Sequence, residues 1–335
     1  MKLEYIKYEK YSINLKTILK NSKTKYITRE GLIIHIKSNR LIGKGEAAPL
    51  QGFSKENLQD VIWNLESFIK SVELNSNYNF IEIVELIKIH CQNIPSLHFA
   101  LDTAIYDIKA QQNKCSISEI LNPNYNNEVY FSDIYINNES KINSNHLKYK
   151  LGIRDISEDI DILNTIHRKK PLINFRFDAN QIFSVTEFQK IYKKLSHLNI
   201  EYFEEPISMP SVNKLSEIQY AAIALDESIY NHNVEDWFKK RLIKFAIIKP
   251  SIFGGYDQIL HFIKKCKKNK VKIIFSSALE STIGNMASIQ IAAILNKQLY
   301  HGLNIHNFYN QFEIMPKYNE NQTVFNLKDT IGLGF

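Results

Sequence analysis

The sequence has few of the residues that mark several protein classes. It contains 3 cysteines, 2 tryptophans, 8 prolines and 11 glycines among 335 residues. The cysteines are odd in number, and neither a CxxC pair nor a Cys/His cluster occurs, which argues against a disulfide framework or a zinc site. The sequence has no apolar run of about 18 residues, and its charged N-terminus lacks a secretory pattern. We therefore expect a cytoplasmic protein with no membrane partner.

Arginine is also scarce, although the chain is basic. Six of the 42 basic residues are arginines, 35 residues are acidic, and the formal net charge is +7. Lysines are dispersed, and the densest run, at 264–272, fits an exposed helix face followed by a strand. A nucleic-acid groove more often clusters arginine with aromatic residues. We therefore expect no nucleic-acid partner, and the sequence carries no signal for an oligomeric state.

The first hundred residues combine strands with helices. Composition and apolar spacing predict strands at 3–19 and 26–36 and helices at 58–72, 81–87 and 96–110. Gly43 and Gly45 predict a short turn before Glu46. This region is expected to form an N-terminal α+β domain at 1–100.

From residue 128 onward, short apolar strands alternate with helical segments. Strands are predicted at 129–135, 146–150, 173–178, 200–204, 222–226, 245–249, 271–276 and 298–303, and helices at 185–195, 215–221, 234–240 and 256–268. Alternation of this kind predicts a parallel sheet, and eight units favour a closed (β/α) barrel. The barrel is expected at 101–304, with a C-terminal segment at 305–335 that returns toward the first domain.

Five of the predicted strands end in a charged residue: Lys150, Asp178, Glu204, Asp226 and Lys249. Each lies about one strand-helix unit after the previous one. All five side chains should therefore emerge at the C-terminal rim of the barrel, where barrel enzymes place their catalytic groups.

The types of these residues indicate a metal-dependent site. Carboxylates that converge from adjacent strands repel one another unless a cation lies between them. An all-oxygen ligand set indicates Mg²⁺, or Mn²⁺ in its place. The lysines would stand on opposite sides of the metal, where a lysine of lowered pKa can act as a base. Taken singly, the acids could instead be helix caps or strand ends, and Lys249 could extend its ammonium to solvent. Because all five charged residues occur at the same position of successive predicted strands, we favour a metal-dependent site over these separate structural roles.

Several short segments carry a resemblance to a known family. They are Lys-Tyr-Lys-Leu-Gly at 148–152, Arg-Phe-Asp-Ala-Asn at 176–180, Phe-Glu-Glu-Pro at 203–206, Asp-Glu-Ser at 226–228 and Ile-Lys-Pro at 248–250. This set resembles the muconate-lactonising-like branch of the enolase superfamily, and the segment at 43–47 resembles the capping domain of that family. The resemblance covers about residues 30–310. It implies a modified (β/α)8 TIM barrel with an N-terminal α+β capping domain.

The resemblance also implies roles for the residues at the rim. Lys150 would remove a proton α to the carboxylate of a small-molecule substrate, and Lys249 would stabilise the intermediate from the other side. Mg²⁺ would be held by Asp178, Glu204 and Asp226. Residues expected to bind substrate or support the site are Lys148, Arg176, Asn180, Ser276, Ser277 and Glu280.

Within the branch, the segments at 249–255 and 275–284 look like those of o-succinylbenzoate synthases. That likeness implies a lyase that dehydrates 2-succinyl-6-hydroxy-2,4-cyclohexadiene-1-carboxylate to o-succinylbenzoate in menaquinone synthesis. Some dipeptide epimerases of the branch carry an Asp-x-Asp at the eighth strand, whereas this chain has Asn304-Ile305-His306, which also departs from the glycine-rich turn of its relatives. Two alternatives remain open: a racemase of N-succinyl or N-acyl amino acids or a dipeptide epimerase, and a non-catalytic metal- or ligand-binding protein. Relatives close the site with a loop at about residues 21–26, where this chain is too divergent for any residue to be assigned.

Overall fold

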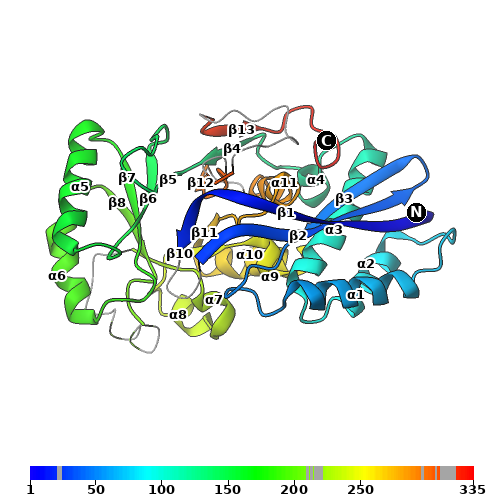
Figure 1. The fold of residues 1–335 in the computed structure, drawn as a ribbon, viewed down its shortest axis with the longest axis horizontal. Coiled ribbons are helices and arrows are strands. Elements are labelled where there is room, and N and C mark those ends of the chain that lie inside the picture. The colour runs from blue at the N-terminus through cyan, green and yellow to red at the C-terminus, as the bar shows by residue number, and fades with distance from the viewer. Residues whose placement is uncertain are drawn as a thin grey trace.

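The computed structural model describes residues 1–20, 25–208, 211, 214, 222–295, 298–305, 308–309 and 322–335. The helix predicted at 215–221, most of the loop at 21–26, and His306 lie outside these ranges. The described chain forms two adjoining parts, a three-stranded sheet with helices and a curled parallel sheet with helices (Figure 1).

The first part, the cap, is an antiparallel sheet with three helices. Its elements are β1 (Leu3–Lys20), β2 (Lys25–Ser38), β3 (Leu41–Ala47), α1 (Leu58–Ser71), α2 (Phe80–His90) and α3 (Pro95–Asn113). The strands are neighbours in the order β1-β2-β3. Capping boxes begin α1 at Asn57 and α2 at Asn79, because each asparagine side chain accepts the backbone N–H three residues later. Two strands and three helices thus lie where the sequence predicts them.

Gly43 and Gly45 lie inside strand β3, so the predicted turn at these residues is wrong. A Cβ atom at Gly43 would overlap the carbonyl oxygen of Ala104 in α3, and one at Gly45 would overlap that of Ala100. The glycines therefore let the strand lie directly against the backbone of the helix. A glycine needed for such a close approach looks the same in sequence as a glycine needed for a turn.

The second part, the barrel, is a curled sheet with helices around it. Seven of its strands are neighbours in the order β11-β10-β9-β8-β7-β6-β5. They are β5 (Asp133–Tyr135), β6 (His146–Lys150), β7 (Asn174–Asp178), β8 (Ile200–Glu204), β9 (Ile223–Leu225), β10 (Phe245–Ile248) and β11 (Lys272–Phe275). The helices are α4 (Ile117–Leu121), α5 (Ile156–Lys169), α6 (Val185–Leu195), α7 (Ser228–Asn231), α8 (Glu235–Lys239), α9 (Pro250–Phe253), α10 (Tyr256–Lys268) and α11 (Thr282–Ala292).

The eighth predicted strand links the two ends of the curl. This strand, β12 (Tyr300–His301), pairs with β4 (Glu128–Phe131), and Gly302 forms a bridge to Ser276 just after β11. The strand predicted at 129–135 is therefore two strands, β4 and β5, of which β4 leaves the seven-stranded sheet. This architecture confirms the predicted modified (β/α) barrel with an N-terminal α+β domain.

The end of the chain contacts both parts. Strand β13 (Val324–Asn326) pairs antiparallel with β4, and the backbone N–H of Leu333 donates to the Asp107 carboxylate of α3 at 2.8 Å. Helix α3 is buried on two sides, with Leu97 in the core of the cap and Phe99 in the core of the barrel. A boundary at residue 100 stays a proposal, because α3 contributes to both cores. Among the described helices, none is long and apolar enough to cross a membrane.

Candidate active site at the rim of the barrel

The five charged residues at the predicted strand ends lie along one rim of the parallel sheet. Lys150 is in register with Asp178, and Asp178 with Glu204, at the ends of β6, β7 and β8. Asp226 follows β9 and Lys249 follows β10, the next two strands in the sheet. The carboxylates therefore form a row with a lysine on each side.

A cavity of about 500 Å³ opens at this rim. Four of the five charged residues line it, together with Lys148 from β6. The exception is Glu204, whose side chain is buried beside Lys148.

Lys148 connects two of the carboxylates. Its ammonium lies 2.9 Å from Asp178 and 2.8 Å from Glu204. Burial by itself would lower the pKa of Lys148, but the surrounding carboxylates outweigh burial and hold that pKa well above its usual value. Lys148 therefore bridges Asp178 and Glu204 and supports both carboxylates.

Lys249 lies against the third carboxylate. Its ammonium donates to both carboxylate oxygens of Asp226. The ring of Phe53 from the cap has its centre 4.3 Å from the same nitrogen. The backbone N–H of Lys249 donates to the Tyr230 hydroxyl at 3.0 Å. Both the backbone and the ammonium of Lys249 are therefore fixed.

The carboxylate row suits a hard divalent cation. Glu204 Oε2 is buried and has no hydrogen-bond partner in the described part of the chain. Burial raises the pKa of Glu204 well above its usual value, against the effect of Lys148, and the carboxylates of Asp178 and Asp226 add to the rise. A bound cation would relieve this repulsion, and Mg²⁺ and Mn²⁺ prefer oxygen ligands. Asp178, Glu204 and Asp226 therefore fit the predicted magnesium site.

Glu205 was not predicted, yet it holds the third carboxylate in place. Its side chain accepts the backbone N–H groups of Asp226 at 2.9 Å and Ser228 at 3.0 Å, and the Ser228 hydroxyl at 2.7 Å. Burial raises the pKa of Glu205 to about 7. The signal available in the sequence was its place in the Glu-Glu-Pro segment, next to Glu204.

Besides Lys148, three of the residues predicted to support the site line the cavity and one lies behind it. Asn180, Ser276 and Ser277 belong to the lining. Asn180 Nδ2 donates to Glu227 at 3.3 Å, and Glu227 also lines the cavity. Glu280 is fully buried and accepts the Ser277 hydroxyl at 2.5 Å. Glu280 thus fixes a cavity residue and does not itself face the cavity.

Arg176 shares strand β7 with Asp178 but lies below the rim. Its Nε donates to the Glu201 carboxylate at 2.6 Å, and Nη1 donates to the Tyr300 carbonyl at 2.7 Å. The guanidinium also lies over the ring of Tyr202, 5.3 Å from its centre. Arg176 therefore steadies a carboxylate of the protein inside the barrel and is not among the residues that line the cavity.

Residues outside the predicted set complete the wall of the cavity. The cap supplies Tyr26, Leu50 and Phe53, the segment after β6 supplies Ile153 and Arg154, and the segment after β12 supplies Gly302, Asn304 and Phe308. The cavity is therefore closed by both parts of the molecule, and no short motif marks the residues of the cap.

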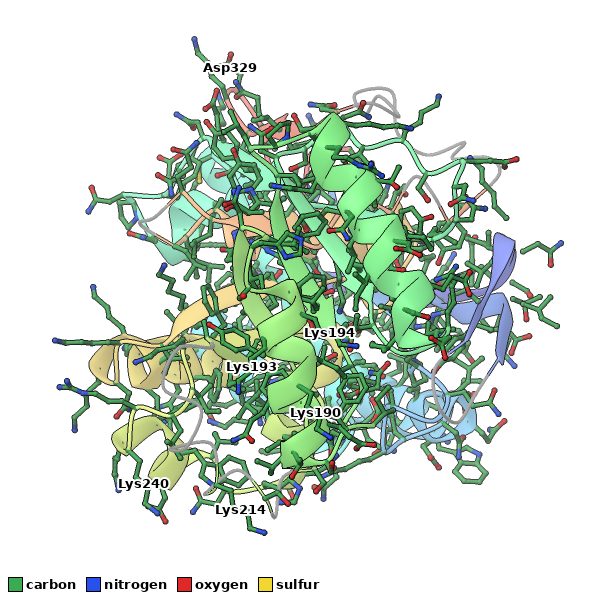
Figure 2. The ribbon with its side chains drawn as sticks, turned by 90° about the vertical axis from the view of Figure 1, so that its left-hand side faces the viewer. Lys190, Lys193, Lys194, Lys214, Lys240 and Asp329 are labelled. Carbon is green, nitrogen blue, oxygen red and sulfur yellow. The ribbon has the colours of Figure 1, made fainter. Side chains whose placement is uncertain are left out.

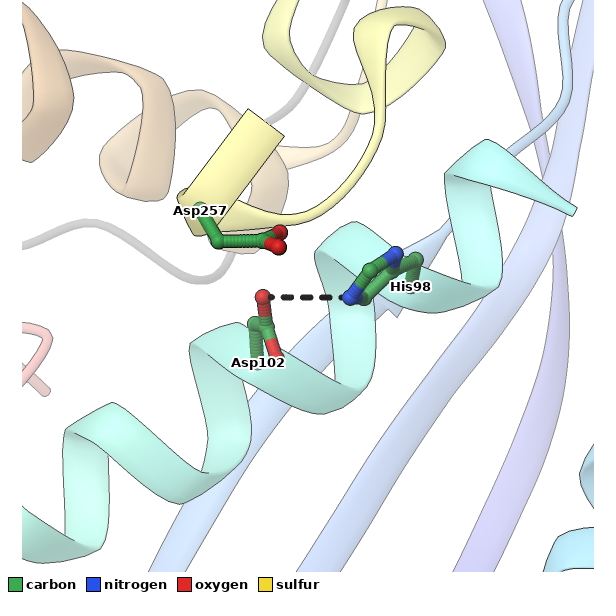
Figure 3. Close-up of side chains that lie close together, drawn as sticks. All are labelled: His98, Asp102 and Asp257. Carbon is green, nitrogen blue, oxygen red and sulfur yellow. Dashed lines mark ion pairs between the residues drawn. The ribbon is translucent and has the colours of Figure 1, made fainter. Parts of the chain in front are cut away.

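A second cluster of ligand-type side chains lies between the two parts. His98 and Asp102 stand one turn apart on α3 and face Asp257 on α10 (Figure 3), with candidate ligand atoms within 4.8 Å of one another. The Asp102 carboxylate accepts the backbone N–H of Tyr256 at 2.8 Å, and Lys88 pairs with Asp257 at 3.2 Å. These contacts make the cluster a joint between α3 and α10.

Surface lysines are spread over the outer helices. Lys190, Lys193 and Lys194 stand on α6, and Lys214 and Lys240 appear in the same view (Figure 2). All five are exposed. Their dispersal agrees with a compositional bias, and the expectation of no nucleic-acid partner stays a prediction.

Two family models match the chain. Residues 140–335 match the family described as Enolase C-terminal domain-like, which is more than half of the sequence. The protein belongs to the enolase superfamily. Residues 4–108 of this superfamily member match the family described as MenC, N-terminal domain.

Curated relatives of this enolase-superfamily chain include synthases and an epimerase. The o-succinylbenzoate synthase of Pasteurella multocida (strain Pm70) is 24% identical over 289 residues, which cover 83% of this chain and 82% of the relative. The o-succinylbenzoate synthase of Vibrio cholerae serotype O1 (strain M66-2) is 26% identical and covers 80% of this chain and 78% of its own. The L-Ala-D/L-Glu epimerase of Francisella tularensis subsp. novicida (strain U112) is 23% identical, with 75% of each chain covered.

Solved structures establish the fold of the whole described chain. The dipeptide epimerase from Enterococcus faecalis V583, complexed with Mg and the dipeptide L-Leu-L-Tyr, has a TM-score of 0.86 at 22% identity and covers 100% of this chain and 99% of its own. The N-succinyl Arg/Lys racemase from Bacillus cereus ATCC 14579 has a TM-score of 0.84 at 17% identity, with coverage of 100% and 95%. Enzymes of this superfamily thus share one scaffold across several reactions.

Proposed function

We propose that the protein is an o-succinylbenzoate synthase, which dehydrates 2-succinyl-6-hydroxy-2,4-cyclohexadiene-1-carboxylate with Mg²⁺ in menaquinone synthesis. The observation that carries the proposal is the rim itself, where Lys150 and Lys249 stand on either side of three carboxylates. The names of the synthase relatives support this reaction among those of the superfamily.

Each residue at the rim has a separate role in the proposed reaction. Mg²⁺ on Asp178, Glu204 and Asp226 would supply positive charge for the substrate carboxylate as the neighbouring C–H bond breaks. Lys150 removes the α proton. Lys249 stabilises the negative charge of the resulting enediolate from the other side of the cavity. The hydroxyl group then takes a proton from an acid and leaves as water, so that the ring becomes aromatic.

Turnover of the cyclohexadiene tests the proposal. Purified protein with Mg²⁺ should form o-succinylbenzoate, and a chelator should stop the reaction. Lys150→Ala and Asp178→Asn should each lower kcat by about 10³-fold or more, since each removes a group that acts in the transition state. The exposed Lys170→Ala is a matched control that should keep full activity. Near wild-type turnover in both rim variants would show that the mechanism is wrong.

A racemase of N-succinyl or N-acyl amino acids, or a dipeptide epimerase, is the second candidate. A dehydration needs one base, whereas a racemase uses two bases on opposite faces of the α carbon, and the two lysines satisfy that requirement as well. The racemase and epimerase structures of the same fold support this candidate. Exchange of the α hydrogen of N-succinyl amino acids in D₂O, with no conversion of the cyclohexadiene, would select it. Mg²⁺ binding without turnover of any of these substrates would instead indicate a non-catalytic binding protein.

A further inference from the structure

Two loops form the roof of the rim cavity, one from each part of the molecule. The cap loop at 48–54 contributes Leu50 and Phe53 to the lining, and the barrel loop at 276–281 contributes Ser276, Ser277 and Leu279. Together with neighbouring apolar side chains, residues of these loops form a separate hydrophobic cluster where cap and barrel meet.

A single buried side chain holds both loops. Arg29 extends from β2 and is only 4% exposed. Its Nε donates to the carbonyl of Ala278 at 3.2 Å, in the barrel loop. Nη1 donates to Pro49 at 2.8 Å and Nη2 to Ala48 at 2.5 Å, both in the cap loop. The planar guanidinium, with five N–H donors in fixed directions, can satisfy these carbonyls together, and a lysine ammonium cannot reproduce that geometry.

Hydrogen bonds within the cap loop connect its first residues to Phe53. The backbone N–H groups of Phe53 and Ser54 donate to the Leu50 carbonyl at 3.0 and 2.8 Å, and the Leu50 N–H donates to the Ser54 hydroxyl at 2.9 Å. The loop is therefore a closed, hydrogen-bonded turn that directly follows Pro49. At its far side, the Phe53 ring covers the Lys249 ammonium and meets the Tyr230 ring edge-on at 5.8 Å.

We propose that Arg29 is a positioning residue for the active site, which holds the roof closed so that Phe53 stays on the ammonium of Lys249. The proposal rests on the proposed function in one respect, the role of Lys249 in stabilising the intermediate. Arg29 itself does not line the cavity. It acts on the cavity through the two loops to which it donates hydrogen bonds.

A kinetic double-mutant cycle tests this coupling. Arg29→Lys and Phe53→Leu should each lower kcat by roughly tenfold, as expected for the loss of one or two positioning contacts, with a smaller change in KM. The double variant should be no worse than the poorer single variant, because both changes release the same contact. Arg40→Lys, at the exposed tip of the β2–β3 hairpin, is the matched control and should leave both parameters unchanged. Effects that multiply in the double variant would overturn the proposal.

Acetylation of Lys249 provides a readout that needs no substrate. Lys249 is 9% exposed in the closed site. Limited acetic anhydride treatment followed by peptide mass spectrometry should show Lys249 modified severalfold faster in Arg29→Lys and in Phe53→Leu than in the wild type, relative to the exposed Lys272. Unchanged acetylation in a folded Arg29→Lys variant would show that Arg29 is only structural. If the wild type fails to convert the cyclohexadiene, the proposed function is wrong, while the acetylation result still decides the role of Arg29.

A third variant covers the case in which Arg29→Lys does not fold. Ser54→Ala removes the side chain that closes the cap turn but keeps Arg29 and Phe53. It should raise Lys249 acetylation to a level between the wild type and Phe53→Leu. Wild-type acetylation in Ser54→Ala, together with raised acetylation in Phe53→Leu, would show that the turn does not carry the position of Phe53 and would overturn the proposal.

Discussion

Glu46 on cap strand β3 and Ser281 at the start of barrel helix α11 are joined by two hydrogen bonds. The Glu46 carboxylate accepts the backbone N–H of Ser281 at 2.7 Å and its hydroxyl at 2.5 Å, and it also accepts the N–H of Gly284 at 2.7 Å. A carboxylate at this position satisfies free N–H groups of the helix terminus and complements the helix dipole. The cap is therefore locked onto the helix that follows the seventh barrel strand.

Replacing Glu46 should weaken this lock. In Glu46→Gln, an amide group faces backbone donors, so at least one buried hydrogen bond is lost. We expect the free energy of unfolding to fall by about 2–3 kcal/mol in urea denaturation. The exposed Glu9→Gln on β1 is the control and should change stability by less than about 0.5 kcal/mol. A Glu46→Gln variant as stable as this control would contradict the lock.

The fold could be predicted because the alternation of short apolar strands with helical segments repeats along the sequence. The five charged rim residues each lie at the end of a predicted strand, so their position on the barrel could be inferred from their spacing before any contact was known. The role of Gly45 could not be read in that way, since it depends on the carbonyl of Ala100 in another element. Arg29 shows the same limit, because its acceptor in Ala278 lies 249 residues away and is a backbone atom that any residue would offer.

Removal of Mg²⁺ should lower the thermal stability of the protein. The three rim carboxylates are buried and raise one another's energy by repulsion. A cation bound to them would stabilise the folded state, by about 2.7 kcal/mol when its concentration is 100 times Kd. Differential scanning calorimetry should show a higher Tm with Mg²⁺ than with EDTA. Asp226→Asn should abolish this difference, whereas Asp236→Asn, on the exposed helix α8, should retain it. A Mg²⁺-dependent Tm that survives Asp226→Asn would place the ion elsewhere.

Asp102 should make stability depend on pH. Burial raises the pKa of Asp102 from 3.8 to about 7 in the folded protein. Because the folded state then binds a proton more tightly than the unfolded state, the contribution of Asp102 is fully present below about pH 4 and is lost as the pH rises to about 7. Around it lie His98, Asp257, Lys88 and Tyr106, and burial lowers the pKa of His98, which favours its neutral form.

Asp102→Asn removes this titration and isolates its effect. Asparagine keeps an oxygen for the Tyr256 N–H but carries no charge at any pH. Relative to wild type, the variant should gain up to about 4 kcal/mol between pH 4 and pH 8, which corresponds to three pKa units. Urea unfolding at several pH values measures the difference and cancels the shared contribution of His98. A flat Asp102→Asn difference would show that Asp102 is ionised without penalty in the fold.

Gly45→Ala should destabilise the protein by disturbing the contact between β3 and α3. The added Cβ would overlap the carbonyl oxygen of Ala100, a backbone atom that cannot rotate away. Either the strand or the helix must shift, which costs about 3 kcal/mol in a well-packed core. Since Glu46 is the next residue, a shift of the strand should also loosen its bonds to α11 and make the effects of Gly45→Ala and Glu46→Gln less than additive. Urea unfolding of the single and double variants measures both effects. Ala100→Gly should not rescue Gly45→Ala, because the glycine keeps the carbonyl; a rescue would mean that the obstructing atom is the Ala100 methyl group and that the backbones do not approach as closely as the structure shows.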